Sequence, residues 1–400
     1  MLLADVMNEP GAIDSGTSPW PAISALRVAV SVRWARPTVI PGAVIANVLR
    51  GALALTFRKL VCPREWIDND CPPCPLYASC AYGQVFAPSP PADAVRLRLQ
   101  QDLPRPFVIE PPGLDSDEPH AADRLRFGLM LFGSAVDRLP YFVTTLERLG
   151  REGMGRDRVP FELIEVRLQH PAGDELLLRE GESTLRLPTR RITTADLIGH
   201  DASVSRSGSE QIRGIGFQPA ISSLENLETR QAGSLSHEES QPRSGSRETS
   251  PASSPRRLTL RFVTPTLLKT GSGIGPNGER LAAREVREKP ELGVVVRRLR
   301  DRLSSLCAFF GTGWFHPDFA GLGAAADRAV LIESDTIWLS RKRTSTRTGH
   351  SYDIEGLVGE ATYEFPDEAT LATLRPLLAM GELIHIGKNA PWGNGKVVVV

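Results

Sequence analysis

The sequence predicts an α+β protein made of two tandem ferredoxin-like (RRM-like, βαββαβ) domains, the first of which carries a cysteine-rich insert. Two observations predict this fold class. The order strand, helix, strands, helix, glycine-rich loop, strand occurs twice along the 400 residues, and a serine-rich stretch without apolar periodicity separates the two runs. The expected divisions are a disordered N-terminus at 1–22, a domain at 23–202 with its insert at 61–82, a disordered linker at 203–254, and a domain at 255–400.

The first domain opens with a strand. Between Leu26 and Trp34, apolar residues alternate with polar ones, which is typical of a strand with one buried face. A helix should follow at 43–60, where apolar residues recur at helical spacing. The remaining elements are expected as strands at 106–110 and 125–132, a helix at 136–149 with Pro140 in its first turn, and a strand at 161–168.

The second domain repeats this order after the linker. A strand at 258–262 precedes a helix at 292–310, in which apolar residues recur at intervals of three and four. Acidic residues lie close in sequence to the arginines of this helix, so we interpret its polar face as solvated. Strands at 329–339 and 356–363, a helix at 369–380 and a final strand at 396–400 complete the domain.

The composition limits the classes of function. Lys plus Arg and Asp plus Glu both number 47, so the formal net charge is zero. This balance excludes a wholly basic nucleic-acid wrapper and requires that any polyanion meet a local patch. No apolar run reaches the length of a membrane span, and no basic region precedes the apolar residues of the N-terminus, as it would in a signal peptide. We therefore expect a cytoplasmic protein without membrane contact.

Four of the five cysteines lie close together, at Cys62, Cys71, Cys74 and Cys80. The close Cys71/Cys74 pair could chelate one ion and the other two could complete a tetrahedron, so the spacing favours a structural zinc site. An iron–sulfur cluster, free thiols and disulfides are the alternatives. A closed four-ligand site leaves no position for substrate, so we assign it to stability.

Several stretches together carry a family resemblance. The chain resembles the CRISPR-associated repeat-processing endoribonucleases of the RAMP superfamily. The matching stretches are 48–52, 71–82, 106–112, 125–133, 260–265, 356–359 and 387–395. The resemblance implies two tandem ferredoxin-like domains and metal-independent cleavage of CRISPR repeat RNA. In that reaction the 2′-hydroxyl attacks the adjacent phosphate, which leaves a cyclic phosphate and a free 5′-hydroxyl.

One departure from the family keeps a second function open. In many relatives the general acid/base histidine lies in or near the first helix, but no histidine occurs here between Arg36 and Leu60. This departure favours a non-catalytic RNA-binding subunit that would associate with other CRISPR effector subunits. A zinc-stabilised scaffold without an RNA role is a third reading.

The C-terminal glycine-rich loop is the first candidate RNA contact. Glycines let backbone N–H groups approach phosphate and permit positive φ, lysines add charge, and a tryptophan can stack on a base. The alternative reading of the loop is a tight connection between the last helix and the last strand. The candidate contacts are Gly387, Lys388, Trp392, Gly393, Gly395 and Lys396.

A basic segment at 338–352 is the second candidate RNA contact. It carries Arg341, Arg343 and Arg347 without an acidic counterpart before Asp353, and such a segment could follow a phosphate chain. A solvated hairpin is the alternative. Arg50, which interrupts the apolar run of the first helix, is a further candidate contact.

For the chemistry we single out His385 and Lys388. A histidine can both remove the 2′-hydroxyl proton and protonate the leaving oxygen, and we expect His385 at an exposed strand end beside the glycine loop. Lys388 would stabilise charge on the phosphorane. A hydrogen-bonded core position is the alternative for His385, with His350 and His316 as the next candidates.

Overall fold

The structure is a computed structural model, and it describes a little over two thirds of the chain. The described residues are 20, 23–38, 42–63, 71, 74–90, 103–111, 122–196, 256–271, 273–274, 280–311, 318–344 and 351–400. The segments predicted to be disordered, 1–22 and 203–254, lie outside these residues apart from Trp20. Among the helices of the described part, none is long and apolar enough to cross a membrane.

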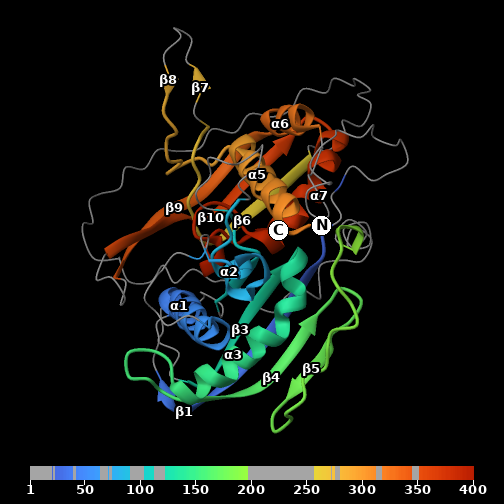
Figure 1. Cartoon of the computed structure of the whole chain (residues 1–400). Helices are drawn as coiled ribbons and strands as arrows, with labels where there is room; N and C mark the ends of the chain where they lie inside the picture. Colours follow the sequence, from blue (N-terminus) through green and yellow to red (C-terminus); the bar gives the residue numbers. More distant parts are fainter. Residues whose placement is uncertain are drawn as a thin grey trace, which may run out of the picture.

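The N-terminal domain is a five-stranded antiparallel sheet in the order β2-β3-β1-β4-β5. Its helices α1 and α3 each connect two strands, β1 with β2 and β3 with β4, that are consecutive along the chain but not adjacent in the sheet (Figure 1). The strands are β1 (Ala25–Thr38), β2 (Phe107–Glu110), β3 (Ala122–Phe132), β4 (Phe161–Gln169) and β5 (Glu175–Arg179). The helices are α1 (Gly42–Val61), α2 (Ala81–Phe86) and α3 (Leu139–Glu152), with short 3-10 turns η2 (Tyr77–Ser79) and η3 (Gly133–Arg138).

The C-terminal domain is a four-stranded antiparallel sheet in the order β11-β6-β10-β9. Its strands are β6 (Arg256–Thr266), β9 (Val330–Thr344), β10 (Ser351–Phe365) and β11 (Val397–Val399). Its helices are α5 (Leu292–Phe310), α6 (Phe319–Asp327) and α7 (Glu368–Ile384), and the turn η4 (Ala390–Trp392) precedes β11. A two-stranded ribbon, β7 (Gly273–Ile274) and β8 (Arg280–Leu281), projects from this domain (Figure 1).

The two sheets confirm the predicted α+β class. In the first sheet β1 lies between β3 and β4, and β2 lies beyond β3. In the second sheet β6 lies in the same way between β10 and β11, and β9 lies beyond β10. This is the strand order of a βαββαβ unit, so the arrangement is consistent with two ferredoxin-like domains. In the first sheet, β5 is added beside the fourth strand. The sequence patterns did not predict α2, α6, β5 or the β7–β8 ribbon, which are short elements.

The alternating apolar residues of β1 form one side of the first hydrophobic core, as the sequence predicted. Leu26, Val28, Val30, Val32 and Trp34 are buried and pack with the inner faces of α1 and α3 in one hydrophobic cluster. Every second residue of a strand points to the same face, so this side of the sheet is closed by the helices. Pro140 lies in the first turn of α3, as expected from its missing N–H.

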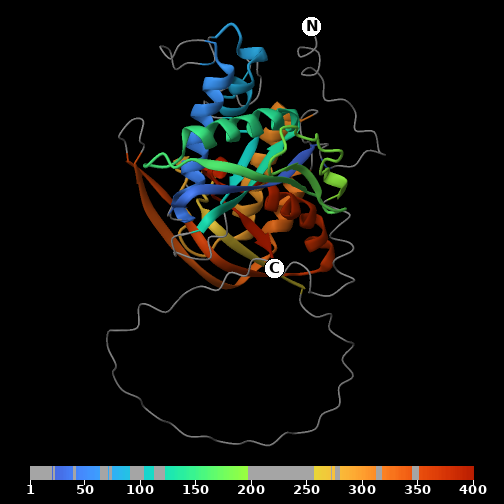
Figure 2. The same cartoon turned by 90° about the horizontal axis from the view of Figure 1, so that it is seen from below.

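The second core extends across the boundary between the domains. It contains the apolar residues of α5, α6 and α7 together with residues of the opposite face of the N-terminal sheet, among them Ala25, Val108, Met130 and Phe132. The two domains therefore share apolar packing, and they lie against each other in both views (Figures 1 and 2). Burial of this shared surface stabilises their relative placement.

Gly133 lies at this boundary, where β3 ends against the end of α5. Its φ is +54°, and a Cβ atom at this position would lie 1.9 Å from the carbonyl oxygen of Phe310. A side chain would therefore be strained by the backbone conformation and would also push the two domains apart.

We predict that Gly133→Ala lowers the free energy of unfolding by about 2–4 kcal/mol, which combines backbone strain with overpacking. Chemical denaturation monitored by circular dichroism measures this change. The matched control is Gly181→Ala, because Gly181 has a φ of +80° but no neighbour within 4 Å of the added Cβ. Equal losses in the two variants would show that contact with Phe310 contributes nothing.

Candidate functional site

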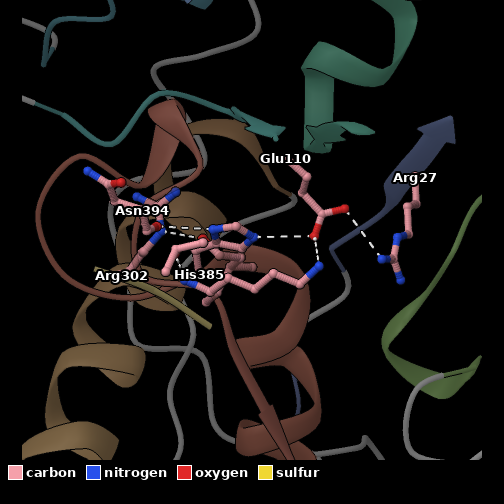
Figure 3. A network of polar contacts seen from close by, with 8 residues as sticks. Arg27, Glu110, Arg302, His385 and Asn394 are labelled. Atoms are coloured by element: carbon pink, nitrogen blue, oxygen red, sulfur yellow. Dashed lines mark hydrogen bonds and ion pairs between the residues drawn. The ribbon is translucent and has the colours of Figure 1, made fainter. Parts of the chain in front are cut away.

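A buried carboxylate joins the two domains beside the glycine-rich loop. Glu110 ends strand β2 of the N-terminal domain, and its side chain is 7% exposed. His385 follows the last residue of α7, and Lys396 precedes β11. Figure 3 shows that side chains from both domains point toward this carboxylate. We call Arg27, Glu110, His385 and Lys396 the Glu110 cluster.

Each oxygen of the Glu110 carboxylate has a cationic or hydrogen-bonding neighbour. Oε1 lies 3.0 Å from Nζ of Lys396 and 3.5 Å from Nε2 of His385, and Oε2 lies 3.3 Å from a guanidinium nitrogen of Arg27. On the other side of the imidazole ring, Nδ1 of His385 lies 3.0 Å from the backbone carbonyl oxygen of Asn394, which accepts a hydrogen bond when Nδ1 carries the proton. The cluster thereby connects β1 and β2 with the two ends of the glycine-rich loop.

The pKa values follow from this geometry. Burial alone would raise the pKa of Glu110, but the hydrogen bond from His385 and the charges of Arg27 and Lys396 hold that pKa well below its usual range. For His385 burial is the largest influence and lowers its pKa, which contact with Glu110 offsets only in part. Glu110 is therefore ionised at neutral pH, and a neutral His385 has one ring proton, which it donates either to Glu110 or to the carbonyl oxygen of Asn394.

The end of α7 explains why His385 turns inward. The helix runs to Ile384, and His385 adopts a φ of +58°, which ends the helix with a left-handed residue. Arg302 of α5 donates from Nε to the carbonyl oxygen of Ile384 at 2.7 Å and so satisfies one of the last helix carbonyls. Burial lowers the pKa of Arg302 to about 10. The prediction of a solvated polar face for α5 is thus wrong at Arg302.

The glycines of the loop are required by packing within the protein. Gly387, Gly393 and Gly395 have φ values of +78°, +79° and +73°. An added Cβ would lie 2.5 Å from the carbonyl oxygen of Ile109 at Gly393 and 1.7 Å from that of Ile386 at Gly395. The loop is therefore the tight helix-to-strand connection that the sequence left open as an alternative, and it seats against β2. Its predicted contact with RNA stays a prediction.

The outer side of the loop is cationic and partly aromatic. Lys388 is exposed and Lys396 is partly exposed. The guanidinium of Arg50, from α1, lies 5.3 Å from the ring centroid of Trp392 in a cation–π contact. Two predicted RNA contacts from different domains are thus brought together, and this contact covers part of the indole ring that was expected to stack on a base.

His385 differs from its predicted position. It was expected at an exposed strand end, but its side chain is fully buried and caps a helix. The alternating Ile384-His385-Ile386 pattern resembles a strand, yet all three side chains are buried. In this conformation His385 cannot touch a substrate, so its geometry supports an anchoring role. The predicted catalytic role of His385 stays untested.

The acidic partner of this site was missed by the sequence interpretation. Glu110 stands at the end of the apolar strand 107–110, which is buried along its whole length. A single carboxylate at the end of a buried strand is a signal that a cation must lie nearby. The partners, His385 and Lys396, come from the other end of the sequence and could not be paired with it by local pattern.

The basic segment lies on another element. Arg341 and Lys342 are exposed residues of β9. Arg343 is also in β9, but its side chain lies outside the described part, as do Arg347, His350 and His316. The RNA contacts expected for this segment therefore stay predictions.

The four clustered cysteines are near one another and partly exposed. Burial raises the pKa of Cys71, and the charges of Arg58 and of the other three thiols act on it as well. Within the described ranges, however, no group of three or more His, Cys, Asp or Glu side chains is close enough to hold a metal ion. The cysteines as placed do not form a ready-made ligand set, and the structural zinc stays a prediction.

Family models match both domains. Residues 23–190 match a model described as an N-terminal domain, and residues 260–397 match the CRISPR-associated endoribonuclease Cas6. The second match includes α7, the glycine-rich loop, and the two residues of the Glu110 cluster that lie in the C-terminal domain, His385 and Lys396. This match agrees with the resemblance to CRISPR repeat-processing endoribonucleases. The C-terminal part of this chain, residues 260–397, is thus similar to the Cas6 family. A comparison with curated proteins found no match.

Among the solved structures that are similar to this chain are several of Cas6 proteins. A Cas6 product complex has 15% sequence identity and a TM-score of 0.47 over 94% of this chain and 100% of that chain. Thermus thermophilus Cas6 has 13% identity and a TM-score of 0.42 over 95% and 99%. A chain of a partial Cas6-RT-Cas1–Cas2 complex has 9% identity and a TM-score of 0.50 over 96% of this chain and 47% of that chain. At this identity the last likeness supports the fold alone.

We predict that His385 makes the stability depend on pH. Its pKa in the folded protein lies below the ordinary value of 6.5, so the unfolded chain binds the proton more readily. The stability that this group contributes is present above that value and falls with decreasing pH, by up to about 1.4 kcal/mol per pH unit. Unfolding free energies measured between pH 7.5 and 5 should fall less steeply for His385→Gln. A wild-type slope in His385→Gln would contradict a lowered pKa for the buried His385.

We also predict that Glu110→Gln lowers the unfolding free energy by about 2–4 kcal/mol, because the amide leaves cations at the domain boundary without a counter-charge. The matched control is Glu162→Gln. Glu162 pairs with Arg33 at 3.1 Å but is 75% exposed, so its loss should cost less than about 1 kcal/mol. Similar losses in the two variants would show that burial of the Glu110 pairings is unimportant.

Proposed function

We infer that this protein binds CRISPR repeat RNA and cleaves it to mature guide RNAs without a catalytic metal. The observation that carries the proposal is the Cas6 family match over residues 260–397. It is supported by the cationic outer side of the glycine-rich loop, which the Glu110 cluster holds in place. A cytoplasmic location follows as part of the same proposal.

The RNA would lie across the outer side of this loop. Lys388 is the exposed cation there, and Lys396 and Arg50 border it from the two domains. Phosphate contacts from lysine and arginine supply affinity that falls with rising salt. The exposed remainder of the Trp392 ring would contact a base. Arg341, Arg343 and Arg347 are the predicted contacts farther along the RNA.

The proposed reaction is an in-line displacement at one phosphate. The 2′-hydroxyl loses its proton and its oxygen bonds to phosphorus, the bond from phosphorus to the 5′-oxygen breaks, and that oxygen takes up a proton. The products are a 2′,3′-cyclic phosphate and a 5′-hydroxyl. Lys388 would stabilise the extra negative charge on the phosphorane, and the loop would hold the phosphate in line. His385 acts in this scheme by holding the loop on Glu110.

The second candidate function is a non-catalytic RNA-binding subunit of a CRISPR ribonucleoprotein. The burial of His385 is the observation that favours it. Of the histidines in the described part, His170 lies in a turn after β4 and His385 is buried, so neither is placed to exchange protons with RNA at the loop. Both candidate functions require RNA binding, and cleavage separates them.

The test is incubation of the protein with end-labelled repeat RNA in EDTA, with the product ends mapped. We expect cleavage to persist in EDTA, to give a cyclic phosphate, and to vanish with a 2′-deoxy nucleotide at the cut. Lys388→Ala should reduce the cleavage rate by about 10²-fold. For single-stranded RNA it should also reduce the steepness of the plot of log affinity against log salt concentration by about 0.7, because one phosphate contact is lost.

The control variant is Lys269→Ala, because Lys269 is a 50% exposed lysine that pairs with Glu285 at 3.7 Å. It should retain both rate and affinity. Binding without cleavage by the wild type would support the subunit function, and absence of binding would overturn both. A Lys388→Ala variant with wild-type rate would show that the loop cation takes no part.

A further inference from the structure

A tyrosine of the N-terminal domain stands among three arginines. Tyr82 lies in α2, which packs beside α1 (Figure 1). Burial raises the pKa of its hydroxyl, and the charges of Arg58, Arg50 and Arg105 all act against that rise. Two of these cations come from α1, and Arg105 comes from the segment just before β2. We call the four residues the Tyr82 cluster.

Aromatic packing fixes the ring of Tyr82. The ring stacks on Phe86 with centroids 5.4 Å apart and an interplanar angle of 20°, and its centroid lies 6.5 Å from that of Phe57. The guanidinium of Arg58 lies 5.6 Å from the centroid of the same ring. These contacts set the position of the hydroxyl before any ligand binds. Because its pKa is raised, the hydroxyl keeps its proton at neutral pH.

The arginines of the Tyr82 cluster differ in their access to solvent. Arg58 is 8% exposed, whereas Arg50, Arg105 and Tyr82 are partly exposed. Nε of Arg105 donates to the carbonyl oxygen of Phe86 at 2.8 Å, which orients its guanidinium beside the aromatic stack. Arg58 therefore supplies charge from a buried position, while the other two arginines and the hydroxyl are placed to donate hydrogen bonds to a ligand.

The donors of the Tyr82 cluster match an anion with several acceptor oxygens. Arginine presents its N–H groups in a planar fork that fits a phosphate, and a phenol that holds its proton is a further donor. The cluster itself contains no acidic side chain. Aromatic rings beside such donors are also typical of surfaces that bind single-stranded nucleic acid. The ligand chemistry that fits is therefore a phosphate of a nucleic acid.

The Tyr82 cluster continues from the cationic outer side of the glycine-rich loop. Arg50 belongs to both, because its guanidinium also lies 5.3 Å from the ring centroid of Trp392. Arg50 and Arg58 are eight residues apart on α1, which corresponds to about 12 Å along the helix axis. Successive phosphates of one strand are spaced more closely than this. The loop and the cluster can therefore hold different phosphates of one RNA.

We propose that the Tyr82 cluster binds a second phosphate of the RNA, away from the phosphate that is cleaved. This inference rests on the proposed function, because the ligand is the same RNA. The Tyr82 hydroxyl and Arg105 donate to the phosphate oxygens, and Arg50 joins the two sites. The cluster supplies affinity and takes no part in making or breaking bonds. By holding one phosphate, it determines which other phosphate reaches the loop.

Fluorescence anisotropy with labelled repeat RNA that carries a 2′-deoxy nucleotide at the cut measures this contribution without cleavage. Tyr82→Phe keeps the ring and removes only the hydroxyl, so affinity should fall about tenfold through the loss of a hydrogen bond to a charged group. Arg105→Gln should reduce the steepness of the plot of log affinity against log salt concentration by about 0.7. Circular dichroism checks that each variant is folded.

A series of RNAs, each with one uncharged methylphosphonate in place of a phosphate, locates the contact. In the wild type, one such replacement away from the cut should weaken binding. The same replacement should cost little in Tyr82→Phe, because its partner on the protein is already absent. Equal costs in the wild type and in Tyr82→Phe at every position would contradict a phosphate contact by this hydroxyl.

Two matched controls change the same groups elsewhere. Tyr141→Phe removes a hydroxyl from another ring beside Phe57, at 5.8 Å between centroids, that is 42% exposed. Arg186→Gln removes the charge of an arginine that is 55% exposed and pairs with Glu182 at 2.7 Å. Both variants should keep the wild-type affinity and the wild-type dependence on salt. Losses as large as those of the cluster variants would show that the effect is unspecific and would overturn the proposal.

The outcomes separate this site from the proposed function. Wild-type affinity in both Tyr82→Phe and Arg105→Gln, together with weakened binding by Lys388→Ala, overturns the second phosphate site and leaves the proposed function standing. Absence of RNA binding by the wild-type protein overturns both. Weakened binding in the two cluster variants, with the methylphosphonate effect lost in Tyr82→Phe, establishes the site.

Discussion

The buried carboxylate of Glu110 is the constraint on which the placement of the glycine-rich loop depends. A carboxylate removed from water is costly unless charges of opposite sign replace its hydration. Here the opposite charges come from Arg27 in the same domain and from Lys396 in the other, where the imidazole of His385 adds a polar contact at 3.5 Å. The carboxylate therefore has all of its polar partners only when the two domains are in contact. Apolar burial alone does not favour one relative orientation of the domains, and these polar contacts do.

The loop meets opposite demands on its two sides. Its inner side must approach backbone closely, which the left-handed glycines permit and any Cβ would prevent at Gly395. Its outer side must leave Lys388 in solvent. A cation that is to stabilise a transition state contributes most when its position is fixed before the substrate arrives. The buried cluster beneath the loop supplies that fixation, which gives the fully buried His385 a positioning role in the proposed reaction.

Periodicity in the sequence was sufficient for the main elements of the fold. The alternation in β1 and the helical spacing in α5 reflect burial against one neighbour, and burial is a local property of the chain. The strand order of both sheets then followed from the repeated order of elements. Short elements such as α2 and β5 were not predicted, because a few residues contain too little of any period to indicate a structure.

The site was less accessible to sequence reasoning because its contacts are long-range. Glu110 and His385 are 275 positions apart, and no pattern near either residue names the other. At His385 the local pattern was misleading: isoleucines on both sides suggested a strand, whereas the helix α7 runs to Ile384 and a left-handed turn buries all three residues. The loop residues were predicted because closely spaced glycines indicate a backbone with positive φ values, which can be recognised from the sequence alone. Their inward packing could be seen only once β2 was in place.

The two basic regions of the chain show how similar composition can serve different surfaces. The cations around the glycine-rich loop converge from three elements of two domains, with one carboxylate buried beneath them. The cations of β9 lie at one end of a single open strand whose other end is acidic. In the linear sequence the acidic and basic halves are separated by apolar residues, so the basic half alone resembled a path for phosphate. Because the signs are separated along this one strand, an RNA that followed it would meet cations only near its last residues, whereas the loop offers cations from both domains around one point.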